Sequence, residues 1–341
     1  MARVLVLGAG IAGLVGARVL EQAGHTVTVL DKGRRPGGRM ATRRPNGDGG
    51  PVFEHGAQFI TLREPTMQPE TDRWRANGWL VEWFRGSPDA APDAAPDAAP
   101  DAAPGNKTGG YPRYRGAPFQ RALPDALAAE LQDVRCGTQV HALEHDAASG
   151  WTAQTDEGPI TADALLCTAP APQTLTLLAA GGSTLPDAVT QQLAAVRFDS
   201  CIAVLAVPHG PTALPARGVL RLGGDQVVEL VRDHHLSGTS PVPAVTLHAS
   251  AATSRTWWDR PDAEVAAHLL TAAAALVGPC DVQGVHRWLY SSPTSSSDDI
   301  APGSDNGPPV RFAGDAFAGG RVEGAARSGH AAAQRLVQAL A

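Results

Sequence analysis

The chain has 341 residues and a formal net charge of −6, so it is long enough for two domains and too acidic overall to favour a nucleic-acid partner. Its four cysteines are scattered without a Cys-x-x-Cys spacing, which indicates buried thiols and no bound metal. No apolar stretch reaches the roughly 20 residues that span a bilayer, and no secretory signal is convincing. We therefore expect a cytoplasmic protein without a membrane partner.

The N-terminal residues predict a strand, a glycine turn and a helix. An apolar run at residues 4–7 meets Gly8, Gly10 and Gly13, and a helical stretch follows to Ala23. In a dinucleotide-binding turn, the first glycine permits the tight bend and the second lets the backbone approach a diphosphate. The third allows the helix to pack closely on the strand. The N-terminus of this helix would then face the phosphates.

The next segment points to FAD. A strand predicted over residues 26–30 ends on Asp31, whose carboxylate can accept hydrogen bonds from both hydroxyls of an adenosine ribose. The sequence RPGGR follows at residues 35–39. It resembles the second signature of glutathione-reductase-like flavoproteins with the amine-oxidase topology, in which these residues line the FAD diphosphate and ribityl chain. The resemblance implies FAD as the tightly held ligand, in preference to NAD.

The chain then becomes irregular. Residues 52–61 predict a strand or a close pair of strands, and residues 74–84 predict a helix. Four copies of Pro-Asp-Ala-Ala occupy residues 88–103. Since proline disfavours helix and sheet, and the repeat has no apolar face, we predict a poorly ordered, solvated loop over residues 86–110. The alternative is a lid over the active site.

The second half of the chain predicts two groups of elements. A helix is expected at residues 123–131, followed by short strands with hairpin turns over residues 134–168. From about residue 186 the pattern predicts an antiparallel sheet with helices. The expected segments are a helix at 189–196, strands at 202–207, 218–222, 227–231 and 244–248, an amphipathic helix at 263–277 and a return strand at 285–290.

The C-terminus resembles a third flavoprotein signature. Residues 310–315 predict a strand that ends on Asp315, and Glu323, Gly324 and Ala325 open a helix that continues to about Leu340. In the family, the matching acid binds the ribityl or diphosphate region. The helix N-terminus points at the pyrimidine end of the isoalloxazine, where it stabilises the negative charge of reduced flavin.

These signatures predict an α/β fold class. We expect a Rossmann-like FAD-binding domain with the glutathione reductase or amine oxidase topology, and an inserted α+β substrate domain built on an antiparallel sheet. The FAD-binding domain is assigned to residues 1–62, 111–180 and 286–341. The substrate domain is assigned to residues 63–85 and 186–285.

Three further motifs narrow the resemblance. GRMATRR at residues 38–44, HGAQF at 55–59 and HRWLY at 286–290 resemble the bacterial renalase-like branch of the FAD-dependent amine-oxidase-like proteins. The resemblance covers nearly the whole chain except the repeat. Phe59-Ile60 replaces an expected Tyr-Phe pair, and residues 116–120 differ from the usual glycine-proline-glycine-methionine stretch, which leaves substrate details open.

The resemblance implies an oxidase of small molecules. Renalase-like enzymes transfer a hydride from abnormal dihydro isomers of NAD(P) to flavin N5 and release NAD(P)+, and oxygen then becomes hydrogen peroxide. A dihydropyridine becomes aromatic when it loses hydride, so we expect this reaction to proceed without a general base. No cysteine follows Cys280, which excludes a C-terminal thioether to the flavin, so FAD is expected to be non-covalent. The choice between NAD and NADP and the oligomeric state stay open.

Other functions remain as alternatives. One is a flavin amine oxidase or desaturase acting on a small amine or a lipid. Typical amine oxidases hold a lysine near flavin N5, whereas the two lysines here are Lys32, next to the ribose acid, and Lys107, in the insert. Another alternative is a non-enzymatic FAD-binding redox protein. An NAD-dependent dehydrogenase is disfavoured by the RPGGR and Gly-Asp signatures.

Two sets of site residues follow. For the substrate pocket, stacking of Trp288 or Tyr290 on a nicotinamide competes with core packing, and strand alternation places Arg287 on the opposite face. Trp257-Trp258 are expected in a core, and His234-His235 in a turn. The candidate pocket residues are His55, Gln58, Phe59, Arg287, Trp288 and Tyr290. The candidate FAD-binding residues are Gly8, Gly10, Ile11, Ala12, Gly13, Asp31, Lys32, Arg35, Gly38, Arg39, Met40, Gly56, Ala57, Val140, Gly314, Asp315, Glu323, Gly324 and Ala325.

Overall fold

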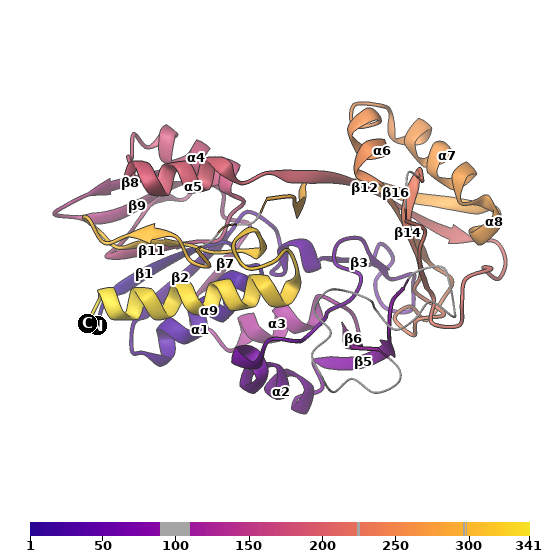
Figure 1. Cartoon of the computed structure of the whole chain (residues 1–341), viewed down its shortest axis with the longest axis horizontal. Coiled ribbons are helices and arrows are strands. Elements are labelled where there is room, and N and C mark those ends of the chain that lie inside the picture. The colour runs from indigo at the N-terminus through magenta and orange to yellow at the C-terminus, as the bar shows by residue number, and fades with distance from the viewer. Residues whose placement is uncertain (89–109, 224–225, 296, 298) are drawn as a thin grey trace.

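A computed structural model describes residues 1–88, 110–223, 226–295, 297 and 299–341. Figure 1 shows a parallel sheet with its helices at one end of the molecule and an antiparallel sheet with its own helices at the other. The long strands β12 (Phe198–Pro208) and β16 (Cys280–Pro293) extend from the second part toward the first. The Pro-Asp-Ala-Ala repeat falls almost entirely on residues outside the described ones.

The first part is built on a six-stranded sheet with the order β17-β18-β11-β1-β2-β7. All neighbouring strands in it are parallel except β17, which is antiparallel to β18. The order places the turn after β1 at the centre of the sheet, where ligands bind in doubly wound folds. The strands are β1 (Arg3–Leu7), β2 (Thr26–Asp31), β7 (Val134–Cys136), β11 (Ala164–Cys167), β17 (Gly303–Ser304) and β18 (Val310–Phe312).

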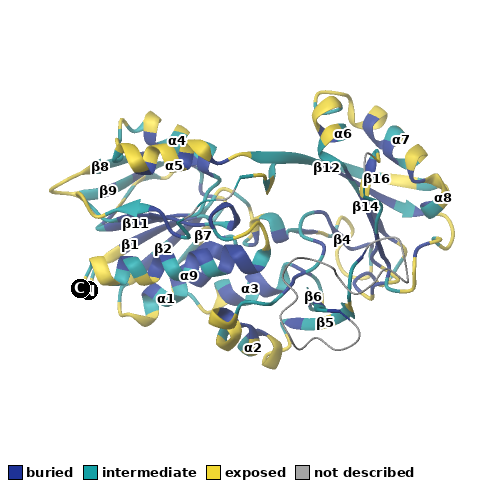
Figure 2. Ribbon diagram, in the orientation of Figure 1, coloured by how far each residue is buried: buried dark blue, intermediate teal, exposed yellow. Residues whose placement is uncertain are grey.

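Both faces of this sheet are covered, as the buried strands in Figure 2 show. Val4 and Val6 pack against α1 (Ile11–Gln22) and α9 (Val322–Ala339), whereas Leu5 and Leu7 face the opposite core. That second core is closed by α4 (Ala171–Ala180), α5 (Asp187–Ala195) and a three-stranded antiparallel sheet. Its strands are β8 (Val140–Asp146), β9 (Gly150–Thr155) and β10 (Gly158–Ala162).

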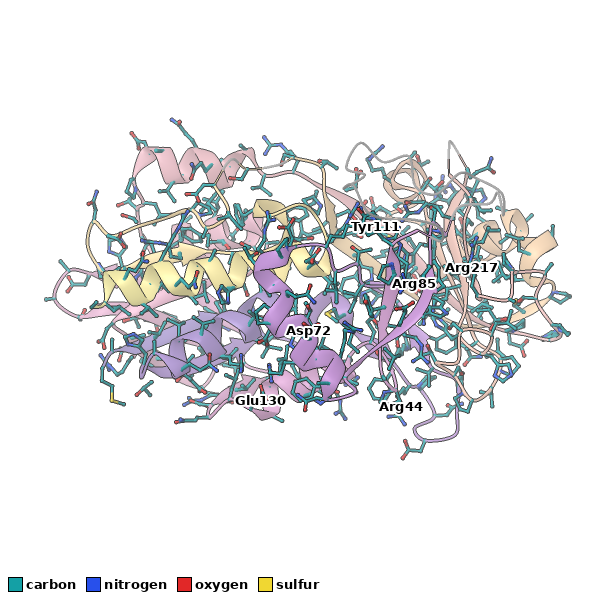
Figure 3. The ribbon with its side chains drawn as sticks, turned by 60° about the horizontal axis from the view of Figure 1, so that its bottom comes forward. Arg44, Asp72, Arg85, Tyr111, Glu130 and Arg217 are labelled. Atoms are coloured by element: carbon teal, nitrogen blue, oxygen red, sulfur yellow. The ribbon has the colours of Figure 1, made fainter. Side chains whose placement is uncertain are left out.

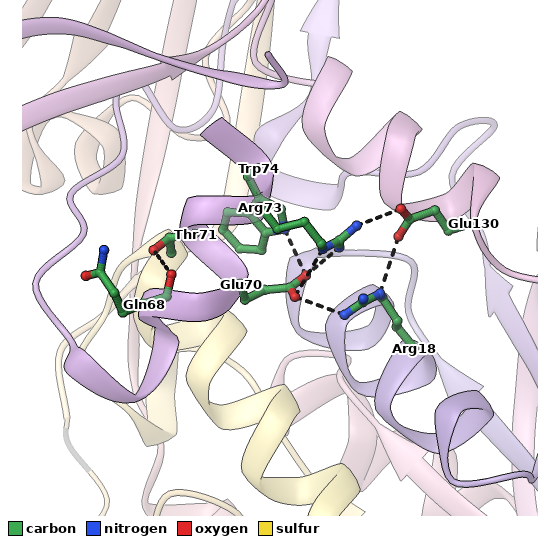
Figure 4. A network of polar contacts seen from close by, with 7 residues as sticks. All are labelled: Arg18, Gln68, Glu70, Thr71, Arg73, Trp74 and Glu130. Carbon is green, nitrogen blue, oxygen red and sulfur yellow. Dashed lines mark hydrogen bonds and ion pairs between the residues drawn. The ribbon is translucent and has the colours of Figure 1, made fainter. Parts of the chain in front are cut away.

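A polar network fastens α2 (Gln68–Ala76) to this part (Figure 4). Glu70 accepts hydrogen bonds from Arg18 of α1 at 2.9 Å and from Trp74 at 2.9 Å. Glu130, at the end of α3 (Ala122–Ala129), pairs with Arg73 at 2.6 Å and with Arg18 at 3.4 Å. Trp74 is completely buried in the core that contains β1 and α1. The segment assigned to the substrate domain therefore packs, through α2, with the parallel sheet.

The helix predicted over residues 74–84 is wrong in its second half. Helix α2 ends at Ala76, and residues 80–85 form strand β5 (Leu80–Arg85), paired with β6 (Pro112–Gly116). Gly78 ends the helix with a φ of +71°, a conformation that favours glycine. Arg85 and Tyr111, at the far end of this pair, are labelled in Figure 3.

The second part is a five-stranded antiparallel sheet with the order β13-β14-β15-β12-β16. Ile202, Val204 and Val285 on one face pack against the helices α6 (Ala251–Thr256), α7 (Asp262–Ala272) and α8 (Ala274–Val277). Ala203 and Leu205 point to the other face, where Leu205 packs on Phe53 of the β3–β4 hairpin. The elements are β3 (Thr42–Arg43), β4 (Phe53–Glu54), β12 (Phe198–Pro208), β13 (Val219–Arg221), β14 (Val228–Asp233), β15 (Val245–Ala249) and β16 (Cys280–Pro293).

Several sequence-based boundaries need correction. The proposed domain limit at 285/286 cuts strand β16, which pairs with β12 over residues 280–293 and so belongs to the antiparallel sheet. The helix predicted at 263–277 is divided at Ala273 into α7 and α8. Helices α4 and α6 were not predicted. None of the described helices is long and apolar enough to cross a membrane.

Candidate functional site

Two glycine segments lie against each other at the end of β1. Gly8 has a φ of +108°, and a methyl group on Gly13 would lie 1.9 Å from the Gly8 carbonyl oxygen, so both positions need glycine. The Gly37 N–H donates to the Ala9 carbonyl at 2.8 Å. A β-carbon on Gly38 would lie 3.6 Å from the Gly10 Cα. The first and second signatures therefore form one backbone surface.

This surface fits a diphosphate. Gly10 is the N-cap of α1, no side chain caps the helix, and the first turn holds no acid. A β-carbon on Gly10 would meet nothing within 4 Å, so the backbone is open at this point. The N–H groups of Ile11 and Ala12 open the helix here, and such N–H groups bind phosphate oxygens.

Asp31, the candidate for the ribose contact, already has backbone partners. Its carboxylate accepts the Ala9 N–H at 2.7 Å and the Gly33 N–H at 2.6 Å. Burial raises the pKa of Asp31 and outweighs these hydrogen bonds, which act in the opposite direction. The carboxylate thus braces the glycine turn, and each oxygen keeps a second lone pair for a ribose hydroxyl. Lys32 and Arg35 are exposed beside it.

Arg39 connects the second signature to the third. Its guanidinium donates to both oxygens of Asp315, at 2.7 and 2.6 Å, and to the Ser291 carbonyl at 2.9 Å. Gly314 precedes this acid with a φ of +151°, and its N–H donates to the Ser328 hydroxyl of α9 at 3.1 Å. Met40, next to Arg39, is buried in the first core. The bidentate pair therefore fixes the two signatures to each other.

The side chain of Glu323 shapes the N-terminus of α9. Its carboxylate accepts the backbone N–H groups of Arg63 and Glu64, at 2.6 and 2.8 Å, and so anchors that segment. A methyl group on Gly324 would lie 2.4 Å from the Ala318 carbonyl oxygen, so glycine permits this close approach. The part of α9 that remains for a ligand is the backbone of its first turn, which includes Ala325.

The remaining FAD candidates flank the same surface. The Ala57 N–H donates to the Arg39 carbonyl at 2.8 Å, and a methyl group on Gly56 would lie 1.9 Å from that oxygen. The Thr138 N–H donates to the Asp31 carbonyl at 3.0 Å, which brings the start of β8, at Val140, close to the ribose acid.

An aromatic and imidazole cluster forms the candidate substrate site. His55 stacks on Trp288, with ring centroids 5.4 Å apart, and meets His286 edge-on at 4.8 Å. The Trp288 indole N–H donates to the His55 carbonyl at 2.7 Å. Gln58 lies next to this group, since its side-chain nitrogen is 3.2 Å from His248 Nε2. We call these five residues the imidazole cluster.

Two predicted aromatic residues lie at the margins of the cluster. Tyr290 meets Phe198 edge-on at 5.6 Å, and the Arg39 guanidinium lies 5.8 Å from the Phe198 ring. This chain of contacts leads from β16 to the FAD-binding signatures. Phe59 instead meets Phe84 of β5 at 6.1 Å, and the Arg217 guanidinium lies 5.8 Å from the Phe84 ring.

Arg287 is separated from the other candidates. Its guanidinium binds the Trp258 carbonyl at 2.8 Å, the Arg260 carbonyl at 2.7 Å and the Asp262 carboxylate at 2.5 Å, on the face covered by α6 and α7. Strand alternation places it opposite Trp288, as predicted. We therefore remove Arg287 from the pocket. Trp257 and Trp258 pack against the core of this sheet.

The histidines of the site favour the neutral state. Burial lowers the pKa of His55 to about 3, with contributions from His286 and Arg43, and that of His248 to about 4, with contributions from Arg221 and Arg232. Burial, and then Arg43, also lowers the pKa of His286. The charged side chains that lower the pKa values of these rings are arginines. The site is therefore electropositive because of its guanidinium groups, whereas its imidazoles are neutral.

Arg232 is completely buried and supports the imidazole cluster through its contact with Gln58. It donates to the Gln58 carbonyl and to Thr239 Oγ1, the latter at 2.8 Å, and lies 4.2 Å from the Trp83 ring. Sequence reasoning missed Arg232, His248 and His286. His286 and Trp288 are two residues apart on one strand, and this spacing could have placed both on one face. No local signal identifies the other two, because β14 and β15 bring them to the cluster.

Comparison with known proteins shows the family of the chain. The family model for flavin containing amine oxidoreductase matches residues 106–337, and that for an NAD(P)-binding Rossmann-like domain matches residues 6–69. The flavin-dependent L-tryptophan oxidase of Lentzea aerocolonigenes is 48% identical over 71 residues, or 20% of this chain and 14% of that protein. The L-amino-acid oxidase of Mus musculus is 55% identical over 42 residues, or 12% and 7%. The matches thus span only a small part of these relatives.

Solved structures share the fold over the full length. Cyclohexylamine oxidase from Brevibacterium oxydans IH-35A has a TM-score of 0.70 at 17% identity and 99% coverage of both chains. Putrescine oxidase bound to putrescine has a TM-score of 0.69 at 17% identity and 99% coverage of both chains. A fatty acid isomerase from P. acnes reaches 0.67 at 14% identity and 98% coverage of both. Because these proteins act on different compounds, the shared fold does not identify a substrate.

Proposed function

The chain belongs to the flavin-containing amine oxidoreductase family and is a flavin-dependent oxidoreductase with FAD as its cofactor, and from that premise we propose that it oxidises a dihydronicotinamide nucleotide. The substrates would be the abnormal dihydro isomers of NAD(P), and oxygen would take up the electrons. This reaction is the one implied by the resemblance to renalase-like proteins. The observation that carries the proposal is the electropositive imidazole cluster next to the three FAD signatures.

The residues present fit FAD. Gly10, Gly38 and the first turn of α1 would hold the diphosphate, Asp31 the ribose, and Asp315 with Arg39 the ribityl region. When bound, FAD supplies a hydride acceptor. The uncapped N-terminus of α9 would favour negative charge on the reduced form.

The chain's own contribution to catalysis would be positioning. His55 stacks on Trp288, and His286 meets both rings edge-on. Together they form an aromatic surface against which a nicotinamide ring could pack. The Trp288 indole and the His55 carbonyl hold each other at 2.7 Å, which fixes the orientation of this surface. Placing the donor carbon close to the acceptor accounts for much of the rate of such a transfer.

The charges in the site disfavour a cationic amine. Arg43 acts on the histidines and has no ionic partner among the described residues, so it would repel an ammonium group. Arg221 and Arg232 also act on the histidines, but they lie beside Glu229 and Glu54, respectively. Lys32 lies beside Asp31, at the adenosine end, and cannot serve as an amine-oxidase lysine near the flavin ring.

A second candidate is an L-amino-acid oxidase. The similarity to the tryptophan oxidase over 71 residues favours it, and a guanidinium in the site could bind a substrate carboxylate. A third candidate, oxidation of a simple amine or a lipid, has only the shared fold in its favour.

Anaerobic reduction of the flavin distinguishes these candidates. The purified holoenzyme is mixed without oxygen with borohydride-reduced NAD, with ordinary NADH, with an L-amino-acid mixture or with putrescine. We expect the isomer mixture to bleach the flavin fastest. Faster bleaching by an amino acid or by putrescine would refute the proposal.

A further inference from the structure

The hairpin β3–β4 places one arginine at the imidazole cluster without an acidic partner. Arg43 belongs to β3 and pairs through its backbone with Phe53 of β4. Within the described part of the chain, no carboxylate forms an ion pair with its guanidinium, and no acceptor takes a hydrogen bond from it. Its neighbour Arg44, in contrast, pairs with Asp48.

The position of this guanidinium is set by a glycine. If Gly284 of β16 carried a β-carbon, that atom would lie 2.9 Å from Arg43 Nη1 and 3.4 Å from its Cζ. Gly284 pairs with Leu205, and His286 pairs with Ala203, so both lie on the face of the sheet opposite to α7. The Arg43 guanidinium therefore rests on β16, next to His286. Burial is the main cause of the lowered pKa values of His286 and His55, and Arg43 is a smaller cause for both.

The surroundings make this a site for an anion. Arg43 is exposed, so its donors are accessible from solvent. The adjacent imidazoles are kept neutral, and a neutral imidazole can still donate one N–H without attracting a cation. A guanidinium binds the oxygens of phosphate groups with two parallel hydrogen bonds.

We infer that Arg43 is a specificity-determining residue that binds a phosphate group of the substrate while the ring to be oxidised lies on the imidazole cluster. The inference rests on the proposed function, since it assigns the substrate class to nucleotides that carry phosphate. The phosphate can come from the diphosphate bridge, from a mononucleotide, or from the 2′-phosphate of an NADP derivative.

The test compares donors that differ in their phosphates. Borohydride-reduced NAD, NADP, nicotinamide mononucleotide and nicotinamide riboside are each mixed anaerobically with wild type, Arg43→Gln and Arg43→Lys. We expect Arg43→Gln to raise the apparent Kd of the phosphate-bearing donors by about tenfold or more, with little change in the limiting rate of flavin reduction. The lysine variant should recover part of the loss, and the riboside should show little dependence on residue 43.

The pattern among donors identifies the source of the phosphate. A loss confined to the NADP derivative points to the 2′-phosphate. A loss that is equal for the mononucleotide and the dinucleotides points to the phosphate nearest the nicotinamide, and a loss in the dinucleotides alone points to the diphosphate bridge. An equal loss for the riboside, or no loss with any donor, would overturn the inference.

A control and a binding measurement separate this inference from the proposed function. Arg3→Gln removes the same charge from an exposed ion pair with Asp163 at the far end of β1, and should change nothing. Inorganic pyrophosphate is also titrated into the oxidised holoenzyme by calorimetry. If no dihydronicotinamide bleaches the wild-type flavin, the proposed function fails. If, in addition, pyrophosphate binds wild type and Arg43→Gln equally, the anion site fails as well.

Discussion

At the scale of single residues, Asp315 is the contact on which FAD retention should depend most. It holds Arg39 through two short hydrogen bonds and joins segments that lie far apart in the sequence. The Asp315→Asn variant keeps the shape and removes the charge. Since hydrogen bonds to charged groups contribute about 1.5–3 kcal/mol, we expect the Kd for FAD to rise by at least about tenfold.

Equilibrium dialysis against FAD measures this change. Asp163→Asn is the matched control, because Asp163 also pairs with an arginine, Arg3, but at an exposed site at the other end of β1. Equal retention of FAD by Asp315→Asn and wild type would remove this pair from the cofactor site.

The buried histidines make stability depend on pH. Burial lowers the folded-state pKa of His55 to about 3 and that of His248 to about 4, below the unfolded value near 6.5. Above that unfolded value both states are neutral, and below it the unfolded chain binds protons that the folded chain excludes. The free energy of unfolding should therefore fall between about pH 6.5 and pH 4, by up to about 1.4 kcal/mol per pH unit for each histidine.

Urea unfolding at about pH 7.5 and about pH 5 tests this expectation. The His248→Gln variant should lose less stability between the two values than wild type does. Glutamine does not titrate, so the unfolded variant binds one proton fewer at the lower pH than the unfolded wild type. The same loss in variant and wild type would contradict the assignment of a depressed pKa to His248.

At the scale of elements, the contact between α1 and α9 brings the two ends of the chain together. A methyl group on Gly329 of α9 would lie 2.0 Å from the Ala12 carbonyl oxygen of α1. Gly329→Ala should therefore separate the helices and destabilise the fold by about 1–3 kcal/mol, although alanine is the better helix former.

The midpoint of urea unfolding reports the effect. Gly210→Ala serves as the control, since a β-carbon at Gly210 meets nothing within 4 Å. It should leave the midpoint unchanged or raise it slightly. If Gly329→Ala were as stable as wild type, the close packing of α1 on α9 would not hold.

The helices and strands also show which elements can be predicted from local sequence patterns and which cannot. The strand, glycine turn and helix at the N-terminus were predicted because their signals are local, and α9 was predicted within one residue of its start. Strand β5 was predicted as part of a helix, although its Val81, Trp83 and Phe84 are residue types that favour strands. Helix α2 ends before Gly78, whose φ of +71° favours glycine.

At the scale of the whole molecule, the candidate cofactor site follows largely from the sequence, whereas the candidate substrate site follows from it only in part. Gly10, Gly38 and Asp315 belong to short contiguous motifs that resemble FAD-binding signatures, so each motif indicates its ligand without knowledge of the fold. The imidazole cluster instead combines His248 of β15 with His286 of β16, and the two strands are brought together only by pairing through β12. Such a cluster depends on strand order, which no local pattern contains.

The position of FAD between the two parts of the molecule decides which residues can act on the substrate. A crystal structure of the protein purified with its flavin tests this most directly. We predict the diphosphate at the N-terminus of α1, between Gly10 and Gly38, and the isoalloxazine at the N-terminus of α9, facing His55 and Trp288. A flavin bound elsewhere, or with its diphosphate away from these glycines, would contradict the account.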